Sequence, residues 1–184
     1  MSQRLHHVLS HTDLPLPELF AARLDGELFR VDHCFAPIDE IEQPAHRAAS
    51  LRAGNPDRVI AEQRSAAWIW GALDTPPAQH ELCVATGARV RAPARGWVHM
   101  REVVIEASEI AVLDDMQVTT PLRTAVDLAR FSVEFGEGEK SIVVSLMTQF
   151  GFGIIDCIDD MNRRRNLPNK RKAIARLARC VGDF

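Results

Sequence analysis

The spacing of apolar residues predicts a short helix and a strand near the N-terminus. Pro15 and Pro17 end any earlier helix, because proline is tolerated only in the first turn of an α-helix. Residues 18–24 then carry apolar side chains at helical spacing, and Gly26 can end this helix in the left-handed conformation. Residues 27–31 follow as a strand. A helix, a tight turn and a strand in this order are typical of the end of a winged helix. The apolar side chains at helical spacing are Leu19, Phe20 and Leu24.

The middle of the chain changes from a helical to a strand pattern. Asn55 and Pro56 can serve as the cap and first residue of a helix that we expect to extend to Gly71 and to be buried. Three segments rich in Val and Ile then predict strands of an antiparallel sheet, punctuated by turn residues such as Asp114. These segments are residues 81–90, 97–105 and 110–119.

Helices dominate the rest of the chain. Thr120 followed by Pro121 is a strong helix start, and two or three more helices follow. The last helix begins after Pro168 and is amphipathic and basic. Its apolar face is formed by Ile174, Leu177, Ala178 and Val181, and its basic face by Lys172, Arg176 and Arg179. We expect the apolar face to hold this helix on the domain and the basic face to point outward.

The composition is that of a globular protein. The 184 residues are 46% hydrophobic and 26% charged, close to the averages for folded domains. No apolar run approaches the roughly 18 residues of a membrane span, and residues 1–7 lack the apolar core of a signal peptide. We therefore expect a cytoplasmic protein that does not bind a membrane. The cysteines are too far apart for a metal knuckle, so we expect reduced, packed thiols at Cys34, Cys83, Cys157 and Cys180.

Charge is distributed unevenly along the chain. The formal net charge of −3 argues against a protein that coats nucleic acid by charge alone. Residues 161–184, however, contain eight basic residues and a single acidic one, Asp183. Such a segment usually marks a surface for an acidic partner, although a solvated helix face has the same pattern. The residues expected to bind nucleic acid or another partner are Arg163, Arg164, Arg165, Lys170, Arg171, Lys172, Arg176 and Arg179.

Two common catalytic and metal-binding patterns are incomplete. A restriction-type nuclease site places an acidic residue two positions before a lysine, and none of the three lysines meets this requirement. His7 and His11 have the i, i+4 spacing of a zinc site on a helix, but the further ligands of that motif are missing. We therefore expect no metal, no cofactor and no enzyme activity. An enzyme would need a site assembled from scattered residues such as His99, Glu102 or Asp156.

Residues 118–130 form the most specific local pattern in the chain. Thr120 can cap a helix that Pro121 begins, and Arg123 and Asp127 have the i, i+4 spacing of an ion pair. An exposed pair of this kind contributes about 0.3 to 0.5 kcal/mol. From the residues alone, the segment is a well-made junction between a strand and a helix.

This junction is similar to the V-T-x-P-x-R-T-x-x-D-L-A signature of actinobacterial proteins in the AbiEi family, the antitoxins and transcriptional autoregulators of type IV toxin–antitoxin systems. Residues 64–71, Arg-Ser-Ala-Ala-Trp-Ile-Trp-Gly, resemble the family pattern S-A-A-W-x-x-G. Residues 21–28 and 36–39 resemble the shortened helix and wing of one branch. The residues that carry the two motifs are Ser65, Trp68, Gly71, Thr120, Pro121, Arg123, Thr124 and Asp127.

The resemblance implies an N-terminal winged helix-turn-helix on operator DNA and a C-terminal α/β domain that counters a nucleotidyltransferase toxin. The family wing usually carries Arg-Arg-Gly before its aromatic residue, whereas residues 32–35 read Asp-His-Cys-Phe. The predicted helix and strand carry only Arg23 and Arg30 as basic residues, so we expect weak DNA binding by this module. Many relatives continue beyond the position of Cys180 into a Vsr-like nuclease domain, which we expect this chain to lack.

We expect an α+β fold with a degenerate winged-helix module at residues 1–43 and an α/β domain at residues 44–184. The second domain combines a short antiparallel sheet with C-terminal helices, and the acidic stretch 39–44 marks the boundary. The expected function is that of a non-enzymatic, antitoxin-like transcriptional regulator that binds DNA and/or counters a nucleotidyltransferase toxin. The alternatives are a protein-binding module without DNA recognition and a remnant of a Vsr-like nuclease-associated protein. The sequence defines neither the operator, nor the toxin, nor the oligomeric state.

Overall fold

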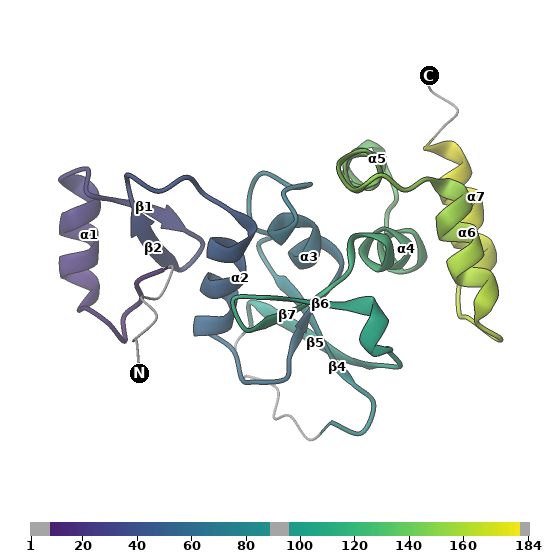
Figure 1. Ribbon diagram of the computed structural model, residues 1–184, viewed down its shortest axis with the longest axis horizontal. Helices are drawn as coiled ribbons and strands as arrows, with labels where there is room; N and C mark the ends of the chain where they lie inside the picture. The colour runs from purple at the N-terminus through teal and green to yellow at the C-terminus, as the bar shows by residue number, and fades with distance from the viewer. Residues whose placement is uncertain (1–7, 89–95, 181–184) are drawn as a thin grey trace.

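The computed structural model describes residues 8–88 and 96–180, which form an α+β fold (Figure 1). Within these residues the helices are α1 (Leu16–Leu24), α2 (Pro44–Ala53), α3 (Gln63–Ile69), η1 (Ala107–Glu109), α4 (Pro121–Phe131), α5 (Glu137–Phe150), α6 (Ile154–Arg163) and α7 (Lys170–Arg179). The strands are β1 (Leu28–Val31), β2 (Cys34–Pro37), β3 (Ile60–Ala61), β4 (His80–Ala85), β5 (Val98–Val103), β6 (Ile110–Leu113) and β7 (Met116–Thr119). Two small sheets and a separate group of helices confirm the α+β class expected from the sequence.

The N-terminal module consists of α1 and the β1–β2 hairpin, at the purple end of the molecule in Figure 1. Both α1 and β1 lie where the sequence predicted them. Val31 pairs with Cys34, so the hairpin turn contains only two residues. Leu19 is buried, but Phe20 and Leu24 of the same apolar pattern are 42% and 85% exposed, because α1 makes its main described contacts with a small hairpin. The winged-helix interpretation of this module stays a prediction.

The central sheet is mixed, with the strand order β5-β4-β3-β7-β6. β3 is antiparallel to β4 but parallel to β7, and β4 is parallel to β5. The predicted antiparallel sheet was therefore wrong, because a Val- and Ile-rich pattern indicates a strand without fixing its direction. Residues 110–119 form the β6–β7 hairpin, whose turn residues Asp114 and Asp115 have positive φ angles of 44° and 62°. The end of the predicted strand at Val90 lies outside the described residues.

Residues 55–71 do not form the single helix that their apolar content predicted. Ile60 and Ala61 instead form β3, and α3 begins only at Gln63, whose positive φ of 47° marks the change of direction. Both β3 residues are buried, and each pairs with one neighbouring strand on either side. Pairing in the middle of a sheet outweighs the local helical preference of a short apolar run, and such runs are ambiguous in sequence.

One hydrophobic core joins the N-terminal module to the sheet. Val31 and Ala36 of the hairpin share a buried cluster with Ala48 of α2, Trp68 of α3 and Leu82 of β4. α2 begins at the predicted domain boundary and packs against both the hairpin and the sheet. The division into two domains at this point stays a prediction.

A second core forms between α4, α5, α6 and α7, at the end of the molecule opposite α1 (Figure 1). Its fully buried side chains include Leu128, Leu146, Met161 and Leu177, one from each helix. Among the described residues, no single helix is long and apolar enough to cross a membrane. α5 and α6 reach that length only as a pair bent by 94°.

Candidate functional site

The two motif segments, residues 64–71 and 118–130, meet where β7 leads into α4. Trp70 Nε1, just after α3, donates to the backbone carbonyl of Thr119 across 2.8 Å. The hydroxyl of Thr119 lies 2.7 Å from that of Thr124 on α4. These bonds fix the end of α3, the end of β7 and the first turn of α4 to one another.

The helix ends in both segments lie close to where the sequence predicted them. Gly71 follows α3 with a φ of 82°, the left-handed conformation that commonly ends a helix. Thr120 accepts a hydrogen bond from the backbone N–H of Arg123, and Pro121 is the first residue of α4. The predicted cap and helix start are therefore confirmed. Five of the motif residues are buried, namely Ser65, Trp68, Arg123, Thr124 and Asp127.

A buried carboxylate, that of Asp127, organises a cluster of arginines beneath this junction. Its Oδ2 accepts from Arg123 Nε at 2.9 Å and its Oδ1 accepts from a terminal nitrogen of Arg130 at 2.8 Å. Arg101 of β5 approaches Asp127 to 3.7 Å. The predicted pair of Arg123 and Asp127 is thus confirmed, but the expectation that it is exposed was wrong, since both side chains are buried.

Further carboxylates extend the cluster across the sheet. Glu109 accepts from Arg123 at 2.8 Å and also pairs with Arg164 of the segment after α6. Glu62, just before α3, accepts two hydrogen bonds of 2.6 Å from Arg101. The arginines of the cluster are therefore balanced by carboxylates, and bidentate pairing gives it a fixed geometry.

The surroundings shift the pKa values of two of these arginines in opposite directions. Burial lowers the pKa of Arg123, but the adjacent carboxylates of Asp127 and Glu109 outweigh that effect and raise the pKa above its usual value. For Arg130, burial is only partly offset by Asp127, and the neighbouring cations Arg123 and Arg164 lower the pKa further. Both groups remain cations at neutral pH, because the guanidinium pKa is so high.

Two cavities flank the loop of residues 164–169 that joins α6 to α7. A cavity of 420 Å³ is lined by Arg101, Arg130, Phe131 and Arg165, together with the loop. A second hollow of 490 Å³ is also lined by residues of this loop and by α7, including Arg164, Asn169, Lys170, Arg171 and Lys172. The loop therefore places several basic groups around two concave surfaces.

Most of the predicted basic residues of this end of the chain are solvent-accessible. We call the set of exposed basic side chains in α6, α7 and their loop the C-terminal basic surface, and it consists of Arg163, Arg165, Arg171, Lys172 and Arg179. Lys170 is half-buried beside it. Arg164 is also half-buried and pairs with Asp160 at 2.8 Å as well as with Glu109.

Arg176 does not belong to this surface, so its predicted outward position was wrong. It is only 8% exposed and donates to the carbonyls of Ala129 and Ser132 at 3.1 and 2.9 Å. Its guanidinium also lies 5.2 Å from the ring centre of Phe135. Arg176 thus satisfies the last carbonyls of α4, a role that basic side chains commonly take at helix ends. Val181, predicted on the apolar face of α7, lies outside the described residues.

The two arginines predicted to bind DNA lie far from the C-terminal basic surface, in the N-terminal module. Arg23 on α1 and Arg30 on β1 are both exposed. Arg30 Nε donates to the backbone carbonyl of Asp32 at 2.6 Å, which ties its side chain to the hairpin turn. The geometry leaves the expectation of weak DNA binding by this module as a prediction.

Sequence reasoning missed most of the arginine cluster and one set of histidines. Glu62, Arg101 and Glu109 come from separate elements, so no local spacing could reveal them. Asp32, His33 and His80 likewise form a group whose ligand atoms all lie within 4.8 Å of one another. His7, the first residue of the i, i+4 histidine pair, lies outside the described residues.

Comparison with known proteins relates the middle of the chain to one family. Residues 59–143 match the family model of the AbiEi antitoxin C-terminal domain. The crystal structure of the RV2827C protein from Mycobacterium tuberculosis is 15% identical, with 95% of this chain and 75% of that chain covered and a TM-score of 0.38, a likeness too weak to support a conclusion. No curated protein matches the chain. The matched segment contains both motif segments and the buried Asp127, and this match supports the assignment of residues 59–143 to the AbiEi antitoxin C-terminal domain.

Proposed function

We propose that this protein is the non-enzymatic antitoxin of a toxin–antitoxin pair and that it counters a nucleotidyltransferase toxin by binding it. The observation that carries the proposal is the match of residues 59–143 to the AbiEi antitoxin C-terminal domain. An antitoxin of this kind needs a surface for its toxin rather than a catalytic centre. The buried arginine cluster suits such a role, since its charges are paired with carboxylates and support the fold beneath the surface.

We place the toxin-binding surface at the C-terminal basic surface. Residues 161–182 contain no acidic residue, and the exposed cations there have no carboxylate of the same segment to neutralise them. The two cavities beside the loop of residues 164–169 add concave shape to this charge. A partner with an acidic, convex surface fits this arrangement, and opposite charges would accelerate its association.

The proposal requires a nucleotidyltransferase gene next to the gene for this chain. Co-expression of the two proteins should relieve the growth inhibition caused by the nucleotidyltransferase alone, and the two should co-purify. The variant Arg165→Glu/Arg171→Glu/Lys172→Glu should lose both effects, because three exposed cations become anions opposite an acidic surface. Its circular dichroism and Tm should match those of the wild type, since all three side chains are exposed.

A matched control uses exposed basic residues outside this surface. Arg23→Glu/Arg30→Glu/Arg58→Glu makes the same change in net charge and should still neutralise the toxin. If both triple variants neutralise equally well, the C-terminal basic surface is not the toxin-binding site. If the wild type neither neutralises the nucleotidyltransferase nor co-purifies with it, the proposed function itself is wrong.

We also propose autoregulatory DNA binding as a second activity, favoured by the cluster of exposed basic side chains beside the loop of residues 164–169. Binding of the full chain to DNA from its own promoter should weaken steeply with salt, because each neutralised phosphate releases a counterion. The variant Arg165→Glu/Arg171→Glu/Lys172→Glu should flatten that dependence by about 0.9 in slope for each phosphate that it no longer neutralises. A larger loss of affinity in Arg23→Glu/Arg30→Glu/Arg58→Glu would assign DNA binding to the N-terminal module instead.

A further inference from the structure

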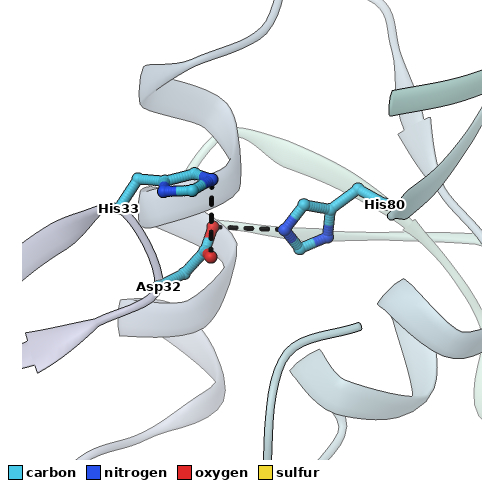
Figure 2. A group of neighbouring side chains, drawn as sticks. All are labelled: Asp32, His33 and His80. Carbon is cyan, nitrogen blue, oxygen red and sulfur yellow. Dashed lines mark hydrogen bonds and ion pairs between the residues drawn. The ribbon is translucent and has the colours of Figure 1, made fainter. Parts of the chain in front are cut away.

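Three potential metal ligands converge between the N-terminal module and the central sheet. Asp32 and His33 form the two-residue turn of the β1–β2 hairpin, and His80 is the first residue of β4. Figure 2 shows the carboxylate of Asp32 between the two imidazoles. His80 Nε2 lies 3.2 Å from Asp32 Oδ2, and His33 Nε2 lies 3.7 Å from Asp32 Oδ1. All three donor groups fall within 4.8 Å of one another.

These separations are close to those of a tetrahedral zinc site. With metal–ligand bonds of 2.0 to 2.1 Å, neighbouring ligand atoms of a tetrahedral ion lie about 3.3 Å apart. His80 Nε2 and His33 Nε2 each lie within a few tenths of an ångström of this separation from an oxygen of Asp32, Oδ2 for His80 and Oδ1 for His33. Because the ligand atoms of all three residues lie within 4.8 Å of one another, rotation of the Asp32 and His33 side chains would bring the three groups onto one ion. Two imidazole nitrogens and one carboxylate oxygen form a donor set that suits Zn²⁺ and other first-row divalent ions.

A second layer of contacts holds the buried histidine in place. His80 Nδ1 lies 3.1 Å from Ser65 Oγ, which also accepts the backbone N–H of Glu81 at 2.8 Å. A hydroxyl oxygen has two lone pairs, so Ser65 can accept from both groups. When Nδ1 carries the proton and donates to Ser65, Nε2 has a free lone pair that points toward Asp32 and can bind a metal ion. Metal-binding histidines are commonly oriented in this way through their second nitrogen.

Two of the three proposed ligand side chains are buried, and the third is accessible to solvent. The side chains of Asp32 and His80 are only 8% and 2% exposed, whereas that of His33 is 53% exposed. The ring of Trp97 packs edge-on against both imidazoles, with centroid distances of 5.0 Å to His33 and 6.0 Å to His80. A cavity of 210 Å³ opens beside Asp32, His33 and Trp97 and is also lined by Ser10. An ion could enter there and keep water at its remaining position.

We propose that Asp32, His33 and His80 together bind one first-row divalent metal ion, and that Zn²⁺ is the ion that suits this donor set best. Such an ion would link the hairpin turn to β4. His80 lies inside the segment that matches the AbiEi domain, and Asp32 and His33 lie before it. The ion would therefore fasten the N-terminal module to the AbiEi domain. No sequence spacing indicates this group, because the two histidines are separated by β2, α2, β3 and α3.

The proposal is tested by titrating ZnCl₂ into the metal-free full chain and measuring the heat of binding by calorimetry. The wild type should bind a single equivalent of Zn²⁺ and its Tm should rise on binding, as for any ligand of the native state. His33→Ala and Asp32→Asn should each weaken Zn²⁺ binding by at least about tenfold, the loss seen even for groups that only support a metal ligand. Both variants should fold without metal, because His33 is half-exposed and asparagine tolerates the positive φ of 53° at residue 32.

His99→Ala is the matched control, because His99 is an exposed histidine on β5 outside the proposed site. It should bind Zn²⁺ as tightly as the wild type. Absence of Zn²⁺ binding to the wild type at micromolar metal would overturn the proposal. Wild-type affinity in both His33→Ala and Asp32→Asn would also overturn it, since binding would then come from other histidines such as those near the N-terminus. Circular dichroism of each metal-free variant separates lost binding from lost folding.

Discussion

The substitution Asp127→Asn tests whether the buried arginine cluster depends on one carboxylate. The change keeps the size and shape of the side chain but removes the negative charge that Arg123 and Arg130 contact at 2.9 and 2.8 Å. Arg101, at 3.7 Å, loses part of its compensation as well. All of this takes place around a residue with no solvent exposure, where water cannot replace the lost charge.

The expected cost follows from which arginines keep another carboxylate. Arg123 still pairs with Glu109, and Arg101 still pairs with Glu62. Within the described part of the chain, Arg130 keeps no carboxylate and retains only the carbonyl of Pro168 at 3.1 Å and the ring of Phe131 at 4.4 Å. Breaking a buried ion pair from one side costs about 3 to 5 kcal/mol, and the remaining pairs favour the lower end, about 3 kcal/mol. For a chain of this size that corresponds to a fall in Tm of about 6 to 12 °C.

Urea unfolding monitored by the fluorescence of Trp68 and its neighbours measures this cost, because Trp68 is buried in the adjoining core. Asp159→Asn, on the exposed side of α6, is the control and should change the free energy of unfolding by less than about 0.5 kcal/mol. The double variant Asp127→Asn/Arg130→Met should recover part of the loss, since it removes the stranded cation. A loss below about 1 kcal/mol in Asp127→Asn would refute the reasoning, because that is the range of an exposed pair.

Four single residues offer further tests. Thr120→Ala should lower the free energy of unfolding by about 1 kcal/mol through loss of the α4 cap, without affecting toxin binding. Arg176→Met should cost about 1.5 to 3 kcal/mol in urea unfolding, because it leaves the carbonyls at the end of α4 without their charged donor. Burial raises the pKa of Glu81 above its ordinary 4.5, so its stabilising contribution is complete below that pH and is lost as pH rises through the raised value. Glu81→Gln should therefore be more stable, relative to the wild type, at pH 7 than at pH 4, as urea unfolding at the two pH values would measure. Burial raises the pKa of the Cys157 thiol to about 12, so alkylation at pH 8 should be slow until urea unfolds the chain.

The proposed metal site and the proposed toxin-binding surface lie in different parts of the molecule. The hairpin turn that holds Asp32 and His33 belongs to the N-terminal module, whereas the C-terminal basic surface belongs to α6, α7 and their loop, at the other end in Figure 1. Variants of one should therefore leave the other unchanged, and His33→Ala should still neutralise the toxin. This separation makes the two proposals independently testable.

Local signals in the sequence were enough to define several helix ends and the resemblance to the AbiEi antitoxin family, which the match of residues 59–143 supports. The Thr120 cap, the initiating Pro121 and the helix end at Gly71 each depend on only a few residues, so they can be read without knowledge of the fold. The buried, free cysteines expected from their spacing are also confirmed. The pair of Arg123 and Asp127 was visible for the same reason, since residues four apart on a helix are neighbours.

Only the tertiary structure decided what lies against these local features. β3 exists because β4 and β7 supply hydrogen-bonding partners on both sides, and strand direction in the sheet depends on the path of the chain between strands. Arg176 points inward because the end of α4 offers it carbonyls, although its helical position alone placed it on a basic face. Burial of Asp127 and the meeting of His33 with His80 require segments far apart in the chain to pack together. A sequence pattern records what a residue can do locally, whereas its solvent exposure and its partners are properties of the packed molecule.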